Sequence, residues 1–297
     1  YVSAWIKCHY PAVFACALLN SQPMGFYAPA QIVRDARDHG VEVRSVDVMY
    51  SAWDCTLEAI MKTDDVALRL GFRQIKGLKE EHATALVAAR TTRYHNGDSQ
   101  DGDFSGEGPH DQSPQNGSYR DIRDIWQRAR LGKPVLERLA RADAYRSLGL
   151  NRREALWEVR ALGPEPLPLF ATDPMAGERP EPVVPLPSAS LGEEVLDDYA
   201  ALKLTLRSHP LALLRSELAA QSAVPASALA DHPPDTYVTV AGLVICRQRP
   251  GTASGVIFGT LEDEEGVANL VIWPKVFERY RKVAMRARLM LATGRLQ

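Results

Sequence analysis

The spacing of apolar residues changes near Tyr237, and this change restricts the fold of the chain more than any other feature. Upstream, apolar residues recur at helical spacing, as in "YRDIRDIWQRARL", which is typical of helices that bury one face. Downstream, apolar and polar residues alternate in "YVTVAGLVICRQ", "GVIFGTLED", "GVANLVIW" and "RARLMLATGRLQ", which is typical of strands. The sequence therefore predicts a multidomain α+β protein with helical regions first and a β-rich region last.

The β-rich region, residues 236–297, contains three predicted strands, the predicted helix "PKVFERYRK" and one further strand. This order resembles the small five-stranded OB-type barrel. The closing strand of such a barrel is missing, so we expect an incomplete OB-fold domain.

Two segments of unusual composition separate the helical regions. Residues 95–118 are rich in Gly, Asp, Ser, Asn and Gln, which predicts a disordered insert. Residues 161–190 are rich in proline and predict an extended linker. A helical connector is then expected over residues 191–232.

Local signals place several elements in the first half of the chain. Residues 29–39 are predicted to form a helix that Gly40 ends, followed by a strand over residues 41–48. Asn151 is predicted to cap a later helix, because Glu154 follows three residues on, as in a capping box.

Composition restricts the class of protein. The formal net charge is −2, so no overall basic field indicates a nucleic-acid partner, although charge can be segregated between domains. No stretch approaches the roughly 20 apolar residues of a membrane span, which predicts no membrane partner. The chain starts at Tyr1 within a predicted helix, and we interpret it as a fragment that lacks material at both ends.

Cysteine and histidine usage indicates neither disulfides nor a metal site. The cysteines are scattered and include no CxxC pair, which favours a reduced, cytoplasmic compartment; they are Cys8, Cys16, Cys55 and Cys246. The histidines are dispersed without useful ligand spacing, so no metal site is predicted.

The segment "QIKGLKEEHATALVAAR" predicts a glycine turn followed directly by a helix. Backbone N–H groups at such a turn and helix start can hold a phosphate, since glycine allows close approach and the helix dipole attracts negative charge. Lys76, Gly77 and Lys79 are therefore predicted to bind duplex DNA phosphates. The segment resembles a helix-hairpin-helix motif, except that Lys79 stands where the turn of that motif usually has a second glycine. The alternative is an ordinary helical turn, in which Glu80 and Glu81 complement the dipole of the helix that follows.

A second glycine turn occurs in "SLGLNRRE", with Arg152 and Arg153 at the start of the next helix. A basic pair is unfavourable beside a bare helix N-terminus and favourable if a phosphate lies between. Both arginines are therefore predicted to bind duplex phosphates, without sequence readout.

The β-rich region carries residues suited to a single strand, because basic groups bind its backbone and aromatic rings stack on its bases. The predicted contacts with template strand are Arg247, Arg249, Phe258, Trp273 and Lys275. Trp273 alternatively belongs to the core. The acidic turn "EDEEG" is expected to face away from nucleic acid.

No pattern of catalytic residues is present. The sequence has no nucleophile–base arrangement, no phosphate-binding P-loop and no carboxylate pattern for two-metal phosphoryl transfer. The predicted catalytic residues, metal ligands and cofactors of this segment are therefore none.

Collinear blocks along the chain resemble the bacterial error-prone DNA polymerases, C-family relatives of the DNA polymerase III alpha subunit. They include "YVSAWIKCHYPAVFACALLNSQPMGFYAPAQIVRDARDHGVEVRSVDV", "LRLGFRQIKGL", "LERLARADAYRSLGLNRREALW" and "GVIFGTLEDEEGVANLVIWPKVFERYR". The resemblance implies the end of the fingers region over residues 1–60, a duplex-binding helix-hairpin-helix domain over 61–160, and an OB domain near the template strand over 236–297.

The resemblance also implies an activity for a longer parent protein. That protein would carry out damage-tolerant, translesion DNA synthesis in the cytoplasm, with catalytic carboxylates and Mg²⁺ in a palm domain upstream of this C-terminal segment. Deoxynucleoside triphosphates would be its substrates, and a sliding clamp and accessory mutagenesis proteins are implied partners.

Two other functions remain open from the residues alone. One is a non-enzymatic nucleic-acid-binding module of a DNA-repair scaffold, which a palm sequence upstream would exclude. The other is a protein-interaction platform built on the Pro-rich linker and the helices after it, which predicts no DNA binding at any salt concentration.

Overall fold

The computed structural model describes residues 1–25, 27–61, 65–91, 118–163, 186–252 and 254–297. The predicted insert 95–118 lies outside these residues except for Ser118, and of the predicted linker 161–190 only residues 161–163 and 186–190 are described. The chain forms two compact units, Tyr1–Leu206 and Arg207–Gln297.

The first unit begins with three helices, α1 (Val2–His9), α2 (Pro11–Asn20) and α3 (Pro29–Asp38), followed by a small sheet. Its strands β1 (Val43–Arg44), β2 (Thr56–Ala59) and β3 (Val66–Arg69) have the order β1-β3-β2. β1 is parallel to β3, and β2 is antiparallel to it.

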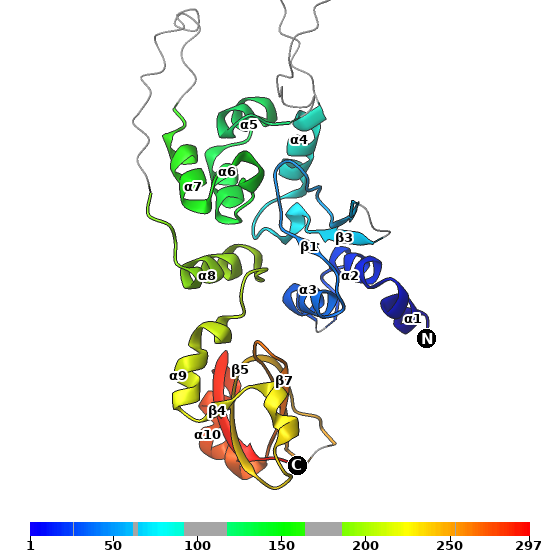
Figure 1. The fold of residues 1–297 in the computed structure, drawn as a ribbon, viewed down its shortest axis with the longest axis vertical. Coiled ribbons are helices and arrows are strands. Elements are labelled where there is room, and N and C mark those ends of the chain that lie inside the picture. Colours follow the sequence, from blue (N-terminus) through cyan, green and yellow to red (C-terminus); the bar gives the residue numbers. More distant parts are fainter. Residues whose placement is uncertain (26, 62–64, 92–117, 164–185, 253) are drawn as a thin grey trace, which may run out of the picture. The chain divides into compact units, whose positions relative to one another are not determined.

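The rest of the first unit is helical (Figure 1). A 3₁₀ turn, η1 (Phe72–Gln74), precedes α4 (Glu80–Thr91). The remaining elements are α5 (Ile122–Ala129), α6 (Lys133–Arg141), η2 (Arg146–Leu148), α7 (Arg152–Ala161) and α8 (Leu191–Leu202).

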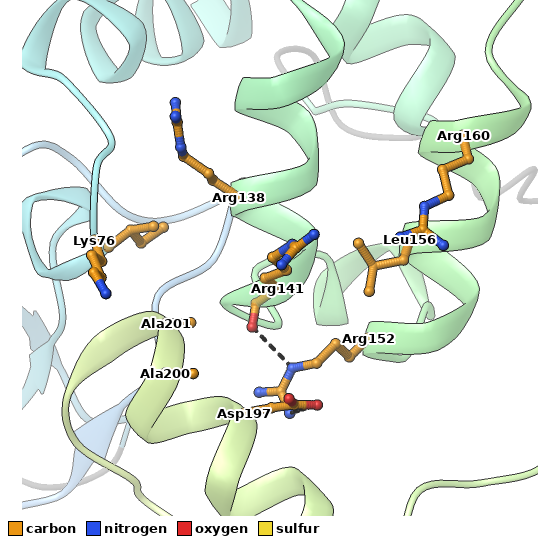
Figure 2. Close-up of a pocket in the computed structure, with 10 residues that line it drawn as sticks. Lys76, Arg138, Arg141, Arg152, Leu156, Arg160, Asp197, Ala200 and Ala201 are labelled. Atoms are coloured by element: carbon orange, nitrogen blue, oxygen red, sulfur yellow. Dashed lines mark hydrogen bonds and ion pairs between the residues drawn. The ribbon is translucent and has the colours of Figure 1, made fainter.

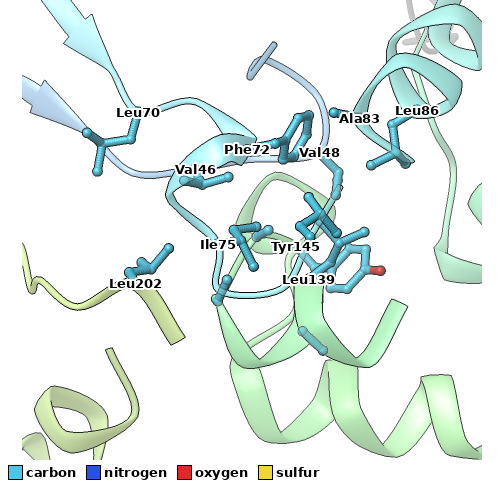
Figure 3. Packing of buried hydrophobic residues seen from close by; sticks show 14 of the residues in the cluster. Val46, Val48, Leu70, Phe72, Ile75, Ala83, Leu86, Leu139, Tyr145 and Leu202 are labelled. Atoms are coloured by element: carbon cyan, nitrogen blue, oxygen red, sulfur yellow. The ribbon is translucent and has the colours of Figure 1, made fainter. Parts of the chain in front are cut away.

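One hydrophobic core extends through the whole first unit, from Ala12 on α2 to Leu204 just after α8. Figure 3 shows Phe72 and Ile75 packed in this core with Leu86 of α4 and Leu139 of α6. Because one core joins these segments, no packing boundary separates the predicted regions 1–60 and 61–160.

Hydrogen bonds also cross the predicted boundary. The amide of Val48 donates to the carbonyl oxygen of Ala144 over 2.8 Å. The carboxylate of Asp47, which is 4% exposed, accepts from the hydroxyl and the amide of Ser147 over 2.6 and 3.1 Å. The segment expected to end a separate region therefore anchors η2, 100 residues later in the chain.

The small sheet differs from the sequence prediction. The helix over 29–39 is confirmed, ending at Asp38, but the strand predicted over 41–48 covers only Val43–Arg44. Strands β2 and β3 were not predicted. Glu58 on β2 joins all three strands, because it pairs with Arg69 over 2.8 Å and with Arg44 over 2.7 Å. Hydrogen bonds from Arg69 and then Arg44 lower the pKa of Glu58.

The second unit starts with short helices, η3 (Pro210–Leu214), α9 (Arg215–Ala220) and η4 (Ala226–Asp231), with β4 (Ala223–Val224) between the last two. The long strand β5 (Tyr237–Gln248) pairs with β8 (Leu289–Arg295) along its first half and with β6 (Ile257–Glu262) along its second half. β6 pairs with β7 (Val267–Ile272), and α10 (Pro274–Arg286) connects β7 to β8.

The strands and the helix predicted after Tyr237 are confirmed in their order, and they form a curled sheet in the second unit (Figure 1). β4, which pairs in parallel with β5, was not predicted. The assignment as an OB-fold stays a prediction.

The division between the units falls inside the predicted connector 191–232. Leu202 of α8 belongs to the core of the first unit, whereas Leu211 and Leu218 pack with Ala241 of β5 in the second. The connector is therefore not an element of its own, because each half buries its apolar residues in a different unit.

Candidate nucleic-acid interface

The first glycine turn connects η1 to α4 and is held from both sides. Ile75 and Leu78 are buried and anchor it in the core. The amide of Lys76 donates to the carbonyl oxygen of Ala201, at the end of α8, over 2.9 Å. Gly77 has φ +78°, a left-handed conformation that favours glycine. The predicted glycine turn is therefore present.

The N-terminus of α4, just after this turn, faces solvent. The amide of Lys79 donates to Nδ1 of His82 over 3.3 Å, which satisfies one donor of the helix start. The amides of Glu80 and Glu81 lie in the first helical turn, where no intrahelical acceptor exists. Among the residues that the structure describes, neither amide has another acceptor within hydrogen-bond distance. This end of α4 therefore offers free donors.

The two lysines of the turn differ in their partners. Nζ of Lys79 lies 3.1 Å from Oε1 of Glu81, and both side chains are more than half exposed. Lys76 is exposed and pairs with no carboxylate of the described part of the chain. An exposed pair of the Lys79 type contributes little, so either lysine can turn to an external anion.

The second glycine turn shares its glycine conformation and its spacing to the next helix with the first. Gly149 also has φ +78°, and α7 begins at Arg152, three residues later, as α4 begins three residues after Gly77. Asn151 caps α7: its side chain accepts from the amide of Glu154 over 3.0 Å, and Glu154 accepts from the amide of Asn151 over 2.8 Å. The predicted capping box is confirmed.

The sequence predicts that Arg152 extends toward an external phosphate, but in the structure its side chain is directed into the protein. It is 2% exposed, and its guanidinium pairs with Glu194 over 2.7 Å and with Asp198, both on α8. Its Nε donates to the carbonyl oxygen of Arg141 over 3.0 Å. The carboxylates of α8, which follow the Pro-rich segment, therefore supply the negative charge for which a phosphate had been expected.

Arg153 remains near the surface but has protein partners. Its side chain, 38% exposed, lies 3.2 Å from Oε2 of Glu193 and donates to the carbonyl oxygen of Pro187 over 2.7 Å. The two predicted phosphate ligands of the second turn are thus both paired with residues at or near α8.

A pocket of about 440 Å³ opens beside the first turn (Figure 2). We call it the basic pocket, since four exposed cations line it: Lys76, Arg138, Arg141 and Arg160. Its remaining lining residues are Ile75, Arg152, Leu156, Asp197, Ala200 and Ala201. The pocket therefore lies where α6, α7 and α8 meet the first turn.

Sequence reasoning missed the arginines of the basic pocket. Arg138 and Arg141 lie three residues apart in "LERLAR", so they share a face of α6. That spacing could have indicated a basic helix face. The contribution of Arg160 on α7 could not be read locally, because it depends on how α6 and α7 pack.

The predicted single-strand contacts lie in the second unit. Phe258 is 41% exposed, and Trp273 is 56% exposed, so Trp273 is not a core residue. Arg249 and Lys275 are exposed, and the Arg249 guanidinium lies over the Phe277 ring, 5.7 Å from its centroid. Arg247 is partly buried and donates to the carbonyl oxygen of Ala287.

The acidic turn of the second unit has an internal partner. Arg215 on α9 pairs with Glu264 and, over 3.3 Å, with Asp263, which is 2% exposed. The hydrogen bond from Arg215 lowers the pKa of Glu264. Through Arg215, the acidic turn therefore holds α9 against the sheet.

In the described ranges, no group of three or more His, Cys, Asp or Glu side chains is placed to hold a metal ion. No helix of the described residues is both long and apolar enough to cross a membrane.

The family model described as helix-hairpin-helix motif matches residues 40–101 and 111–155 of the chain. Both glycine turns lie within these ranges. The matched part also covers the strands and helices that carry the first turn, which agrees with a helix-hairpin-helix unit in the first compact unit.

Curated relatives match along the whole chain. "Error-prone DNA polymerase" of Ruegeria pomeroyi is 54% identical over 300 residues, which cover 100% of this chain and 24% of the relative. The protein of the same name from Sinorhizobium medicae is 46% identical over 319 residues, covering 100% of this chain and 26% of the relative. "Error-prone DNA polymerase 2" of Agrobacterium fabrum is 46% identical over 303 residues, with the same coverage. Along its full length, this chain is therefore similar to proteins named error-prone DNA polymerase, and it spans about a quarter of the length of these relatives.

Proposed function

We propose that the chain is the C-terminal DNA-binding part of an error-prone DNA polymerase. The observation that carries this proposal is the open N-terminus of α4 behind Gly77, with free amides and two exposed lysines beside the basic pocket. Backbone donors at a helix start bind phosphate without reading sequence, as a polymerase that moves along its product requires.

In this proposal, the first turn holds a phosphate of the product duplex. The amides of Glu80 and Glu81 donate to the phosphate oxygens, and Lys76 and Lys79 add a salt-dependent attraction. Gly77 lets the duplex backbone approach closely. Arg152 takes no direct part, because its guanidinium is buried among the carboxylates of α8.

The second unit is proposed to guide the template strand. Phe258 and Trp273 present exposed rings for base stacking, and Arg249 and Lys275 supply positive charge nearby in the sequence. An OB-type domain would use such a face. This assignment rests on the exposure of the aromatic residues and on the relatives' name.

The longer parent protein is proposed to perform translesion synthesis in the cytoplasm. Its palm domain, upstream of this chain, would transfer deoxynucleotides to a primer end with Mg²⁺ as cofactor. Residues 1–60 would end its fingers region, and a sliding clamp and accessory mutagenesis proteins would be partners. The match to proteins named error-prone DNA polymerase along all of this chain favours this function over a non-enzymatic repair scaffold.

Fluorescence anisotropy on labelled primer–template duplex across a salt series tests the proposal. For Lys76→Gln/Lys79→Gln, we expect weaker binding and a log–log salt slope shallower by about 2, because about 0.9 counterions are released per neutralised phosphate. The matched control, Lys7→Gln/Arg37→Gln, removes two cations from α1 and α3 and should keep the original slope. Equal slopes in the two double variants would contradict duplex binding at the first turn.

A further inference from the structure

The basic pocket brings together cations from three elements. Lys76 comes from the first turn, Arg138 and Arg141 come from α6, and Arg160 comes from α7. Figure 2 shows Arg141 between Lys76 and Arg160 in this view. Four like charges around one cavity repel each other, and this repulsion is relieved when an anion enters.

Protein carboxylates do not fully neutralise this cluster. Arg141 lies 3.6 Å from Oε2 of Glu137, an exposed-face pair on one helix. Arg138 and Arg160 pair with no carboxylate among the residues described. Asp197, the acidic residue of the lining, lies 3.6 Å from Nη1 of the buried Arg152 and is thus directed toward the protein.

The cavity is built by contacts that fix its walls. Arg152 ties α7 to α8 through Glu194 and Asp198, and the Lys76 amide ties the first turn to α8 at Ala201. At Gly77, an added Cβ would lie 3.4 Å from Nε of Arg138, so the glycine leaves room for that side chain. The backbone positions that carry the cations are therefore fixed around the pocket before any ligand binds.

The lining also has an apolar part, formed by Ile75, Leu156, Ala200 and Ala201. Apolar walls lower the local dielectric and strengthen the attraction between a guanidinium and an anion. Arginine presents a planar fork of donors that matches phosphate oxygens. The volume of about 440 Å³ admits a group larger than a single phosphate, such as a phosphate with its attached sugar.

We propose that the basic pocket is a second phosphate site, in which Arg138, Arg141 and Arg160 bind a phosphate group through their side chains. It is separate from the backbone amides of the first turn. The ligand is a phosphate of a nucleic-acid strand, internal or terminal, or a free pyrophosphate, which share the same chemistry. As a site for DNA, it rests on the proposed function of this unit.

The test compares two triple variants of the 297-residue chain. Arg138→Gln/Arg141→Gln/Arg160→Gln empties the pocket of three cations, and Arg120→Gln/Arg123→Gln/Lys133→Gln removes three exposed cations elsewhere on α5, α6 and the segment before them. Anisotropy is measured with primer–template duplex, with and without a 5′-phosphate, and pyrophosphate is titrated by calorimetry. Thermal unfolding followed by circular dichroism checks that both variants stay folded.

We expect the pocket variant to bind duplex roughly tenfold or more weakly and the control less than threefold more weakly. Arg138→Lys/Arg141→Lys/Arg160→Lys should lie between, because charge is kept and the planar fork is lost. If a 5′-phosphate strengthens duplex binding only while the three arginines are present, the ligand of the pocket is the terminal phosphate of a strand. Equal losses with both duplexes assign an internal phosphate, and pyrophosphate binding lost in the pocket variant assigns the free ligand.

Two outcomes separate this inference from the proposed function. Duplex binding that weakens equally in the pocket variant and the control, without pyrophosphate binding, overturns the pocket site and leaves duplex binding at the first turn intact. Pyrophosphate binding that depends on the three arginines, with no duplex binding by the unchanged chain, supports the pocket and overturns the proposed function.

Discussion

The two glycine turns of the first unit share the glycine conformation and the spacing to the next helix, but their basic side chains differ in exposure. In each, a glycine at φ +78° is followed by leucine, and a helix starts three residues after the glycine. At Gly149, the reciprocal hydrogen bonds of Asn151 and Glu154 satisfy the amides of these two residues, whereas the amides of Arg152 and Arg153 have no acceptor among the described residues. At Gly77, the cap position holds Lys79, whose side chain offers no acceptor, and the first amides of α4 stay open.

This difference shows that the turn backbone alone does not decide whether a hairpin binds a ligand. The residue at the cap position decides whether a protein side chain satisfies the amide of the third helical residue. The direction of the adjacent basic residue matters as well. Arg152 turns inward to carboxylates, whereas Lys76 remains exposed, so the second turn supports the fold and the first is available for binding.

The largest expected effect comes from removing the inward arginine of the second turn. Arg152→Leu leaves Glu194 and Asp198 without their cation, and removing one partner of a buried ion pair costs about 3–5 kcal/mol of unfolding free energy. Urea unfolding measures this loss. Arg153→Leu is the matched control, because its side chain is partly exposed, and it should cost about 1 kcal/mol or less.

Unchanged stability together with weaker DNA binding in Arg152→Leu would contradict a structural role for the second turn. If Arg152→Leu unfolds at the original urea concentration and binds duplex more weakly, Arg152 is a phosphate ligand, as the sequence alone predicted.

A smaller effect on unfolding free energy is expected from substituting either turn glycine, and duplex affinity should distinguish the two substitutions. Gly77→Ala and Gly149→Ala each place a side chain at φ +78°, which costs about 1–2 kcal/mol of unfolding free energy. Only Gly77→Ala should also weaken duplex binding, because its turn is the open one. Urea unfolding and anisotropy on the same samples compare both quantities. Equal losses of DNA affinity would mean that both turns contact the duplex, and the comparison would fail.

The smallest effect comes from closing the first turn with the cap of the second. Lys79→Asn supplies the acceptor that Asn151 supplies to α7, so the unfolding free energy should rise by about 1 kcal/mol. Duplex affinity should fall further than in Lys79→Gln, which loses the same charge without gaining a good cap. Thermal unfolding and anisotropy measure these changes. If both variants bind duplex equally, the amide that the new cap satisfies is not a phosphate donor.

Local patterns predicted the elements that depend on nearby residues. The capping box at Asn151, the turn at Gly77 and the strands after Tyr237 follow from contacts within a few residues or from strict alternation, and the structure contains all three. In contrast, β2 and β3 are four residues each and owe their stability to pairing and to Glu58, which joins residues far apart in sequence. Short strands of this kind leave little periodic signal.

The candidate site was predicted only where its chemistry is local. Lys76 and Gly77 were found from the turn itself. The fate of Arg152 depended on α8, which begins 39 residues later, so its inward position could not be read from "NRRE". The basic pocket was missed for the same reason, because its walls come from elements that meet only in the folded unit.

The continuous core from Ala12 to Leu204 also sets the size of the piece that can be exchanged between related proteins. A graft limited to the hairpins would cut through side chains that interlock across the whole unit, including the contact between Asp47 and Ser147. Chimaeras should therefore tolerate a junction near Leu206 and Arg207, where the two compact units meet along the chain, and resist one near residue 60. We therefore expect the first 206 residues to be exchangeable between related proteins only as one unit.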